Sequence, residues 1–194
     1  FANPGPDGKF NSLFFFHWED FNNEIINNWK DITRTLLSIP MAHQLIGFYT
    51  VADDTDNILK VMRSYQYYAA NQISDVVAKT DWTNPNTRGG YVWHTTGSGK
   101  TMTSFKSAQL IANSKDADKV IFLMDRIELG TQSLDEYQNF ADNKDDVSGT
   151  ENTKDLITQM KDDQNVLIVT SIQKMSLIKK ELGIYTLDSE VINK

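Results

Sequence analysis

Two glycines, a serine, a lysine and a threonine stand together at residues 97–101 of the 194-residue chain. Gly97 and Gly99 permit backbone torsions that turn successive N–H groups into one concavity, and such a nest binds anions. A helix that begins near Lys100 would add the positive end of its dipole. The Lys100 ammonium could then reach the outer phosphates of a nucleotide, and the Thr101 hydroxyl could face a Mg²⁺ ion. The segment is therefore predicted to be a phosphate-binding loop.

The stretches on both sides favour a nucleotide site over an accidental glycine-lysine turn. The apolar run from Tyr91 to Trp93 is predicted to form a buried strand, and residues 101–112 are predicted to form a helix. His94 stands where the strict G-x-x-x-x-G-K-[ST] pattern has its first glycine, and we interpret it as a strand-end residue without a chemical role. The predicted catalytic residues are Lys100 and Thr101, and Thr101 is also the predicted metal ligand. The residues expected to contact the nucleotide are Thr95, Thr96, Gly97, Ser98, Gly99, Lys100, Thr101 and Met102.

Beyond this loop, apolar runs alternate with amphipathic segments. The pattern predicts strands at residues 119–124 and 166–169, a polar loop at 143–152, and helices up to about residue 142, at 153–160 and at 171–182. Strands that alternate with helices indicate an α/β fold with a parallel sheet flanked by helices. Ligands of such sheets bind beyond the carboxyl ends of the strands, and the phosphate-binding loop, Asp125 and Thr170 all fall there.

The N-terminal part of the chain has a different, mainly helical pattern. A short buried strand or packed segment is expected at residues 13–16. Apolar residues recur at helical spacing over residues 21–51 and Pro40 interrupts them, so two helices are expected to meet at that proline. We therefore predict an N-terminal extension or connection at residues 1–57 and the α/β domain at residues 58–194.

Composition narrows the classes of protein to which the chain can belong. Nineteen basic and 26 acidic residues give a formal charge of −7, which argues against a broad basic surface for nucleic acid. The chain has no cysteine, and its three histidines lack the spacing of metal ligands, so no structural metal is expected. No apolar stretch approaches the roughly 20 residues that span a bilayer, so a cytoplasmic protein is expected. The first residue is phenylalanine, so we expect the sequence to begin inside a longer protein.

Four local patterns follow one another in a fixed order. They are Arg63-Ser64-Tyr65-Gln66 at the start of a helix predicted over residues 59–79, the phosphate-binding loop, Asp125-Arg126 after the next strand, and Thr170-Ser171-Ile172-Gln173-Lys174 after the third. With these patterns the chain closely resembles the restriction (R) subunit of type I restriction–modification enzymes. The resemblance runs from about Val61 to Lys180.

This resemblance implies a specific activity and a set of partners. The chain would be the first RecA-like half of a superfamily 2 motor, which uses ATP and Mg²⁺ to translocate double-stranded DNA in an enzyme that also cleaves it. Arg63 and Gln66 would bind the cofactor, with Gln66 reading adenine. The specificity and modification (methyltransferase) subunits of the same complex would be the protein partners. The residues that would face DNA are Arg126, Thr170, Ser171, Gln173 and Lys174.

Parts of the family pattern are missing from the sequence. We find no D-E-x-H carboxylate pair at the end of an apolar strand, no nuclease constellation, and none of the later motor motifs with their arginine. We therefore expect the sequence to stop before the Walker B strand, and the chain alone to be inactive. Other readings stay open: another superfamily 2 protein of type III restriction or repair, a small P-loop kinase, or a nucleotide-gated interaction module without catalysis.

Overall fold

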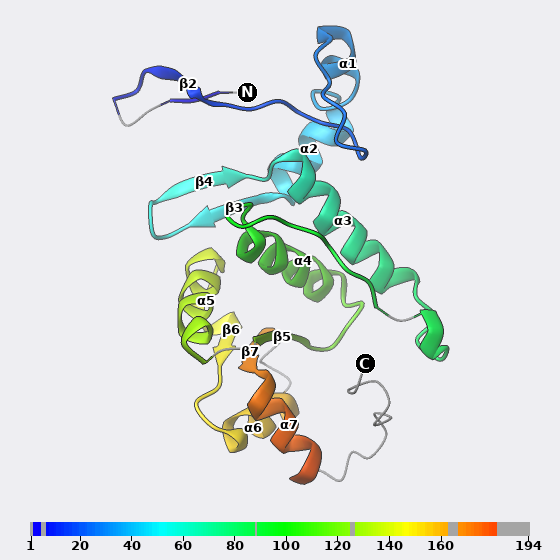
Figure 1. The fold of residues 1–194 in the computed structure, drawn as a ribbon, viewed down its shortest axis with the longest axis vertical. Coiled ribbons are helices and arrows are strands. Elements are labelled where there is room, and N and C mark those ends of the chain that lie inside the picture. The colour runs from blue at the N-terminus through cyan, green and yellow to red at the C-terminus, as the bar shows by residue number, and fades with distance from the viewer. Residues whose placement is uncertain (1, 5–6, 88, 125–126, 163–166, 182–194) are drawn as a thin grey trace. The chain divides into compact units, whose positions relative to one another are not determined.

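The computed structural model describes residues 2–4, 7–87, 89–124, 127–162 and 167–181 (Figure 1). The chain forms two compact units, the first made of Phe1–Val51 and Leu59–Ser107 and the second made of Ala52–Ile58 and Ala108–Lys194. The division falls within the long helix α4, at Lys100–Ser114. The predicted boundary between residues 57 and 58 stays a prediction.

Short elements make up the N-terminal part of the chain. They are β1 at Ala2–Pro4, β2 at Phe10–Phe15, α1 at Trp29–Arg34, α2 at Ile39–Gly47, β3 at Thr50–Asp53 and β4 at Ile58–Val61. β1 pairs with β2 in antiparallel fashion, and β3 with β4 forms a second two-stranded sheet. Pro40 lies in the first turn of α2, where a missing N–H leaves no helical bond unmade, so the two expected helices do meet there.

The helical prediction for residues 21–51 was wrong at both ends of that range. Residues 21–27 contain turns and an isolated bridge, and β3 begins at Thr50. Both ends were misjudged because apolar residues at helical spacing also suit a hairpin that buries alternate side chains. Val51 and Asp53 of β3 are buried whereas Ala52 between them is exposed.

Aromatic side chains fix helix α3, at Ser64–Lys79, within the first unit. Trp18, Tyr49 and Tyr67 are buried, and the rings of Tyr49 and Tyr67 meet edge to face at 4.6 Å. The Tyr49 hydroxyl donates a hydrogen bond to Oδ1 of Asn71 at 3.1 Å, and the Tyr67 hydroxyl donates one to Oε1 of Gln44 at 3.2 Å. Because both hydroxyls have partners, the two tyrosine rings can be buried without leaving their hydroxyls unpaired.

The second unit contains a parallel sheet, as the sequence predicted. Its strands are β5 at Val120–Met124, β6 at Val147–Gly149 and β7 at Leu167–Ser171, in the order β5-β7-β6. Helices α5 at Ile127–Phe140, α6 at Thr153–Lys161 and α7 at Ile172–Glu181 alternate with these strands. The middle strand β7 is buried along its whole length, and Ile168 packs against Leu156 of α6 and Ile178 of α7.

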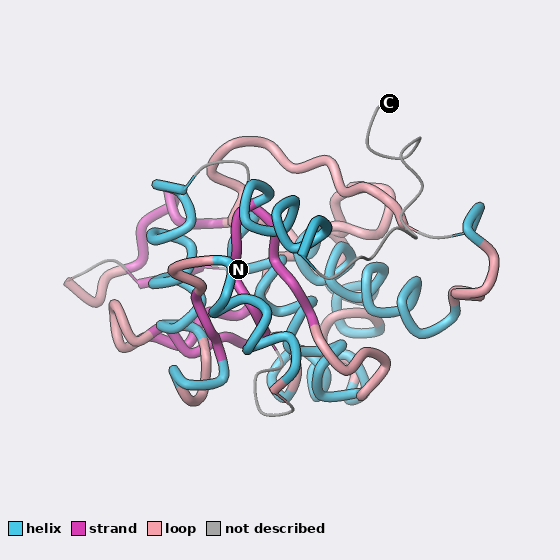
Figure 2. Tube along the Cα trace, turned by 90° about the horizontal axis from the view of Figure 1, so that it is seen from below, coloured by secondary structure: helices cyan, strands magenta, loops and turns pink. Residues whose placement is uncertain are grey.

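The segment between α3 and α4 departs from the prediction. Residues 91–95 form no strand, and the chain runs there as a loop, shown in pink in Figure 2, with a 3₁₀ turn at Pro85–Thr87. The Tyr91 and Trp93 side chains are 92% and 87% exposed. The predicted strand was wrong because an apolar run becomes a strand only where a neighbouring strand takes its backbone N–H and C=O groups. Among the described residues, no strand pairs with residues 91–93.

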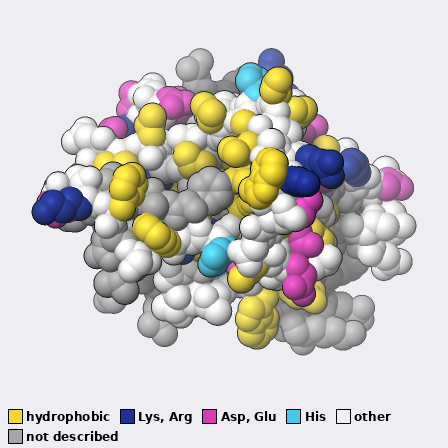
Figure 3. Space-filling model, turned by 90° about the horizontal axis from the view of Figure 1, so that it is seen from above, with side chains coloured by type: hydrophobic (Ala, Val, Ile, Leu, Met, Phe, Trp, Pro, Cys, Tyr) yellow, Lys and Arg dark blue, Asp and Glu magenta, His cyan; other side chains and the backbone are white. Residues whose placement is uncertain are grey.

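Other hydrophobic side chains are also exposed on the described surface. Yellow hydrophobic side chains stand among white atoms, which are backbone and other side chains, on the face shown in Figure 3. Trp29, Ile39 and Leu59 are among the exposed residues, and they come from three different elements. None of the described helices combines the length and the apolar character that crossing a membrane requires.

Candidate nucleotide-binding site

The predicted phosphate-binding loop is a tight turn closed on one carbonyl oxygen. The Thr95 carbonyl accepts hydrogen bonds from the Ser98 N–H at 3.3 Å, from the Ser98 hydroxyl at 2.8 Å and from Lys100 Nζ at 3.0 Å. Gly97 and Gly99 have φ angles of 77° and 78°, in the left-handed region that disfavours residues with a Cβ atom. The loop therefore takes its shape from its two glycines and from the donors around Thr95.

Helix α4 begins directly after this turn. The Gly99 carbonyl accepts from the Thr103 N–H and from the Thr103 hydroxyl, both at 3.0 Å, so Gly99 caps the helix. The first N–H groups of any helix have no partner within the helix, and they carry its positive dipole end. In α4 these groups belong to Lys100, Thr101 and Met102, which the sequence predicted at the nucleotide. The Lys100 side chain is exposed.

The predicted adenine-reading residue, Gln66, is buried behind the loop. Its side chain is 4% exposed and uses both ends of its amide within the protein. Oε1 accepts from the Arg63 N–H at 3.0 Å, which closes the first turn of α3, and Nε2 donates to the Ser98 carbonyl at 2.9 Å. A Cβ atom added to Gly99 would stand 2.4 Å from this Nε2, so the glutamine occupies the space that Gly99 leaves open.

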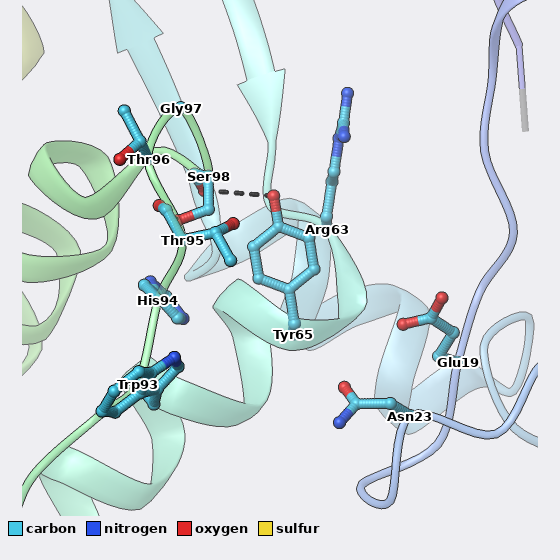
Figure 4. Close-up of a pocket in the computed structure, with 10 residues that line it drawn as sticks. All are labelled: Glu19, Asn23, Arg63, Tyr65, Trp93, His94, Thr95, Thr96, Gly97 and Ser98. Atoms are coloured by element: carbon cyan, nitrogen blue, oxygen red, sulfur yellow. Dashed lines mark hydrogen bonds between the residues drawn. The ribbon is translucent and has the colours of Figure 1, made fainter.

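A pocket of about 440 Å³ opens beside the loop (Figure 4). It is lined by Glu19, Asn23, Arg63, Tyr65, Trp93, His94, Thr95, Thr96, Gly97 and Ser98. The structure thus brings five predicted nucleotide-binding residues into one cavity: Arg63, Thr95, Thr96, Gly97 and Ser98. The Tyr65 hydroxyl donates to the Ser98 carbonyl at 3.0 Å, so α3 holds the loop through two side chains, Tyr65 and Gln66.

His94 has surroundings that the sequence did not suggest. It is half-buried, lines the pocket, and meets the Tyr65 ring edge to face at 5.6 Å. Burial lowers the pKa of the His94 imidazole, and the nearby Lys100 ammonium lowers it further. The imidazole is therefore neutral around pH 7 and adds no positive charge to the pocket.

The residues predicted to face DNA lie at the carboxyl end of β7 and the start of α7, except that Arg126 lies outside the described residues. Thr170 is buried, and its hydroxyl is hydrogen-bonded to the Thr150 hydroxyl at 2.8 Å. The buried Ser171 hydroxyl accepts from the Lys174 N–H at 3.3 Å, and Lys174 Nζ donates to the Thr150 carbonyl. These three side chains connect the residue that follows β6 with β7 and α7, whereas Gln173 is exposed.

Comparisons with known proteins identify the family. Residues 65–193 match the family of SWI2/SNF2 ATPases. The chain is 41% identical over 170 residues to the type I restriction enzyme SsaAORF53P endonuclease subunit of Staphylococcus saprophyticus. This match covers 88% of the chain and 17% of the staphylococcal protein. It is 36% identical over 165 residues to a Mycoplasma pneumoniae protein described as the putative C-terminal part of the type I restriction enzyme MpnIIP endonuclease subunit. This match covers 81% of the chain and 78% of the Mycoplasma protein. The chain belongs to the family of type I restriction enzyme endonuclease subunits.

Membership of the type I endonuclease subunit family confirms the resemblance and the α/β fold that the sequence predicted. A second staphylococcal subunit, SauCOLORF180P of Staphylococcus aureus, is 39% identical over 170 residues. The chain spans 17% of the length of these two staphylococcal relatives. The SWI2/SNF2 match begins at Tyr65, so the pocket residues Glu19, Asn23 and Arg63 lie before the matched region.

Sequence reasoning missed five residues of the pocket, among them His94, which was interpreted as having no chemical role. Tyr65 was part of a motif but had no assigned role, and Trp93 was assigned to a buried strand. Glu19 and Asn23 belong to a polar turn far from the loop in sequence, and no local signal distinguishes them from residues of any solvated turn. Only the packing of that turn on α3 brings them to the pocket.

Proposed function

We propose that this chain is the ATP-binding part of the motor of a type I restriction endonuclease subunit. In the intact enzyme, ATP hydrolysis would drive the translocation of double-stranded DNA, and cleavage would follow. The observation that carries the proposal is the loop of residues 95–99, closed at the start of α4 beside a pocket of about 440 Å³. That volume lies within the range of about 300–1,000 Å³ typical of small-molecule sites. The match to SWI2/SNF2 ATPases supports the same assignment.

The loop and the start of α4 would bind the phosphates. Their N–H groups and the helix dipole favour an anion at this point, as in other phosphate-binding loops. Lys100 Nζ would exchange its bond to the neutral Thr95 carbonyl for a charge-assisted bond to a phosphate oxygen. Arg63, which lines the pocket beside the loop, would supply a guanidinium charge there.

Mg²⁺ would be held chiefly through the nucleotide. Thr101 follows Lys100 in the first turn of α4, where its hydroxyl offers a hard oxygen ligand. Mg²⁺ usually keeps several waters and is bound by one or two carboxylates together with substrate phosphates. In the part of the chain that the structure describes, no group of three His, Cys, Asp or Glu residues lies close enough to hold a metal ion. When bound, Mg²⁺ would neutralise charge that develops on the phosphates.

Gln66 would contribute in two ways. Its bonds to Arg63 and Ser98 connect α3 to the loop, so it would hold the loop in a shape that binds phosphate. Its amide oxygen and its amide nitrogen can each make one more hydrogen bond, which fits our proposal that it also contacts adenine. A different base would then disturb the hydrogen bond between Gln66 Nε2 and the Ser98 carbonyl.

Contacts with DNA would be local and directed at phosphates. The exposed Gln173 and the neighbouring Lys174 stand at the carboxyl end of the sheet, on a chain of net charge −7. Phosphate contacts position a protein on DNA and read no sequence. Target choice would then rest with the specificity subunit, which together with the modification subunit we propose as partner.

The test is ATP hydrolysis by the intact subunit carrying Lys100→Ala. We expect DNA-stimulated hydrolysis to be lost and ATP affinity to fall by about 10- to 150-fold, since one charge-assisted bond contributes about 1.5–3 kcal/mol. The matched control is Lys79→Ala, which removes an exposed lysine of α3 that pairs with Asp75 one turn away. Unchanged hydrolysis by the Lys100→Ala variant would refute the proposal. Binding without hydrolysis by the unaltered enzyme would indicate a nucleotide-gated module instead.

A further inference from the structure

Helix α2 carries large apolar side chains on the side that faces solvent. Ile39, His43 and Ile46 stand at positions i, i+4 and i+7, which share one face of a helix. Ile39 is 86% exposed, Ile46 is 72% exposed, and His43 is exposed as well. The Phe48 ring, which is 53% exposed, meets the His43 ring edge to face at 6.2 Å. We call these four residues the outer face of α2.

The inner side of α2 already has its partners within the first unit. Leu45 is buried, and its carbonyl accepts a hydrogen bond from the Thr50 hydroxyl at 2.8 Å. Oε1 of Gln44 accepts from the hydroxyl of Tyr67 in α3 at 3.2 Å. Because these contacts fix the orientation of the helix, the outer face stays on the surface of the unit.

The segment around α2 has no formal charge. Residues 35–52 contain no Asp, Glu, Lys or Arg, although these four types make up 23% of the whole chain. A helix at a solvated surface normally presents charged and polar side chains on its outer side. The buried centres of protein interfaces, in contrast, are depleted of charged residues. The outer face of α2 therefore has the composition of an interface.

Charge also selects the kind of partner. Nucleic acids are bound mainly by Lys and Arg side chains at their phosphates, and helices that lie on a membrane surface are rich in the same residues. The outer face of α2 contains neither residue type. An apolar protein surface fits it instead, and interfaces of this apolar kind are typical of permanent contacts.

The same polypeptide is the source of such a permanent partner. The chain spans 17% of the length of its two staphylococcal relatives, so most of a subunit of that length lies outside residues 1–194. Domains joined in one polypeptide meet at a high effective concentration, which favours contact between them over contact with a separate chain. The outer face also lies before Tyr65, where the match to SWI2/SNF2 ATPases begins.

We propose that the outer face of α2 is the docking surface for another domain of the same endonuclease subunit, outside residues 1–194. Ile39 and Ile46 would be buried in that contact, with His43 and Phe48 packed beside them. The inference uses the family of the chain and does not depend on the binding of ATP to the loop.

The first experiment identifies the partner by photo-crosslinking in the intact subunit, with the specificity and modification subunits present. Benzoylphenylalanine in place of His43 or of Ile46 should form cross-links to residues of the same polypeptide outside residues 1–194. These products keep the electrophoretic mass of one subunit, and mass spectrometry locates the cross-linked residue. Cross-links to a second copy or to another subunit would overturn the proposal, and so would cross-links confined to residues 1–194 or none at all.

Lys79 supplies the matched control position. Its side chain is 72% exposed, as that of Ile46 is, but it carries a charge. Benzoylphenylalanine in place of Lys79 should give little cross-linking, and an equal yield from all three positions would overturn the proposal because no face would then be preferred.

The second experiment places a charge in the interface. Ile46→Glu leaves the packing of the first unit unchanged because the side chain is exposed there, whereas a carboxylate buried against an apolar domain is costly. Backbone amides in the cross-linked segment should exchange hydrogen for deuterium about tenfold faster in this variant of the intact subunit, and amides of α3 should keep their rates. Ile46→Leu is the apolar control and should keep all rates. Unchanged exchange of the cross-linked segment in Ile46→Glu would overturn the proposal.

Discussion

Gly99→Ala changes the loop at the point where it touches α3. The residue has a φ of 78°, and an added Cβ atom would stand 2.4 Å from Nε2 of Gln66, closer than atoms of these types approach. The glutamine amide would have to move away. Its hydrogen bond from Nε2 to the Ser98 carbonyl would then be lost.

The expected loss of stability has two parts. Placing a residue with a Cβ atom in the left-handed region costs about 1–2 kcal/mol. Losing the bond to Ser98 costs about 0.5–1.5 kcal/mol more. Gly97→Ala is the matched control, because Gly97 has a φ of 77° and no atom within 4 Å of its added Cβ. The difference between the two variants, about 1 kcal/mol, therefore measures the contact between Gly99 and Gln66.

Urea unfolding followed by tryptophan fluorescence suits this comparison. All four tryptophans, Trp18, Trp29, Trp82 and Trp93, belong to the first unit, so the signal reports the unit that holds the loop. In a Gln66→Ala background, Gly99→Ala should cost no more than Gly97→Ala, since the obstructing amide is gone. Equal destabilisation by the two glycine variants in the unaltered background would refute the reasoning.

Three further predictions concern other residues. NMR titration should give a His94 pKa below the ordinary 6.5, and a pKa at or above 6.5 would contradict the environment described. Between the folded pKa and 6.5 the unfolded chain binds more protons than the folded chain, so stability should fall as the pH falls through this range. Burial raises the pKa of Tyr49 to about 12, so stability should decline as the pH rises above 10, and the absorbance change at about pH 12 should be lost in Tyr49→Phe. Thr170→Val should lower the free energy of unfolding by about 1 kcal/mol in circular dichroism, because the Thr150 hydroxyl loses its partner; a neutral effect would mean that this bond contributes nothing.

Local patterns were enough to predict the glycine loop and two strands of the second unit's sheet, β5 and β7. The glycines at 97 and 99 have left-handed torsions that few other residues adopt, and β7, which is buried along its whole length, begins with the apolar residues Leu167, Ile168 and Val169. Such features depend on a few neighbouring residues. They were therefore predicted correctly without knowledge of long-range contacts.

Features that depend on distant partners were not predicted. Strand β6 lies within residues that were predicted as a polar loop. It was missed because only one of its three residues, Val147, is apolar, and its strand conformation depends on pairing with β7. Glu19 and Asn23 reach the pocket only through Trp18 and Phe21 on α3. A short segment of sequence does not determine which distant helix it will contact, so the presence of Glu19 and Asn23 in the pocket could not be predicted.

The hydrogen bond between Lys100 Nζ and the Thr95 carbonyl would affect the rate at which the loop binds a nucleotide. In the free protein it already holds the Lys100 ammonium in place. Ordering a free lysine side chain costs about 1.5–2 kcal/mol, and here that entropy is lost on folding instead of at the moment of capture. If the loop binds a nucleotide as proposed, the arriving phosphate would meet a cation that is already in place and would compete with one neutral oxygen for it. Capture would then require the exchange of a single hydrogen bond, without a search through lysine rotamers.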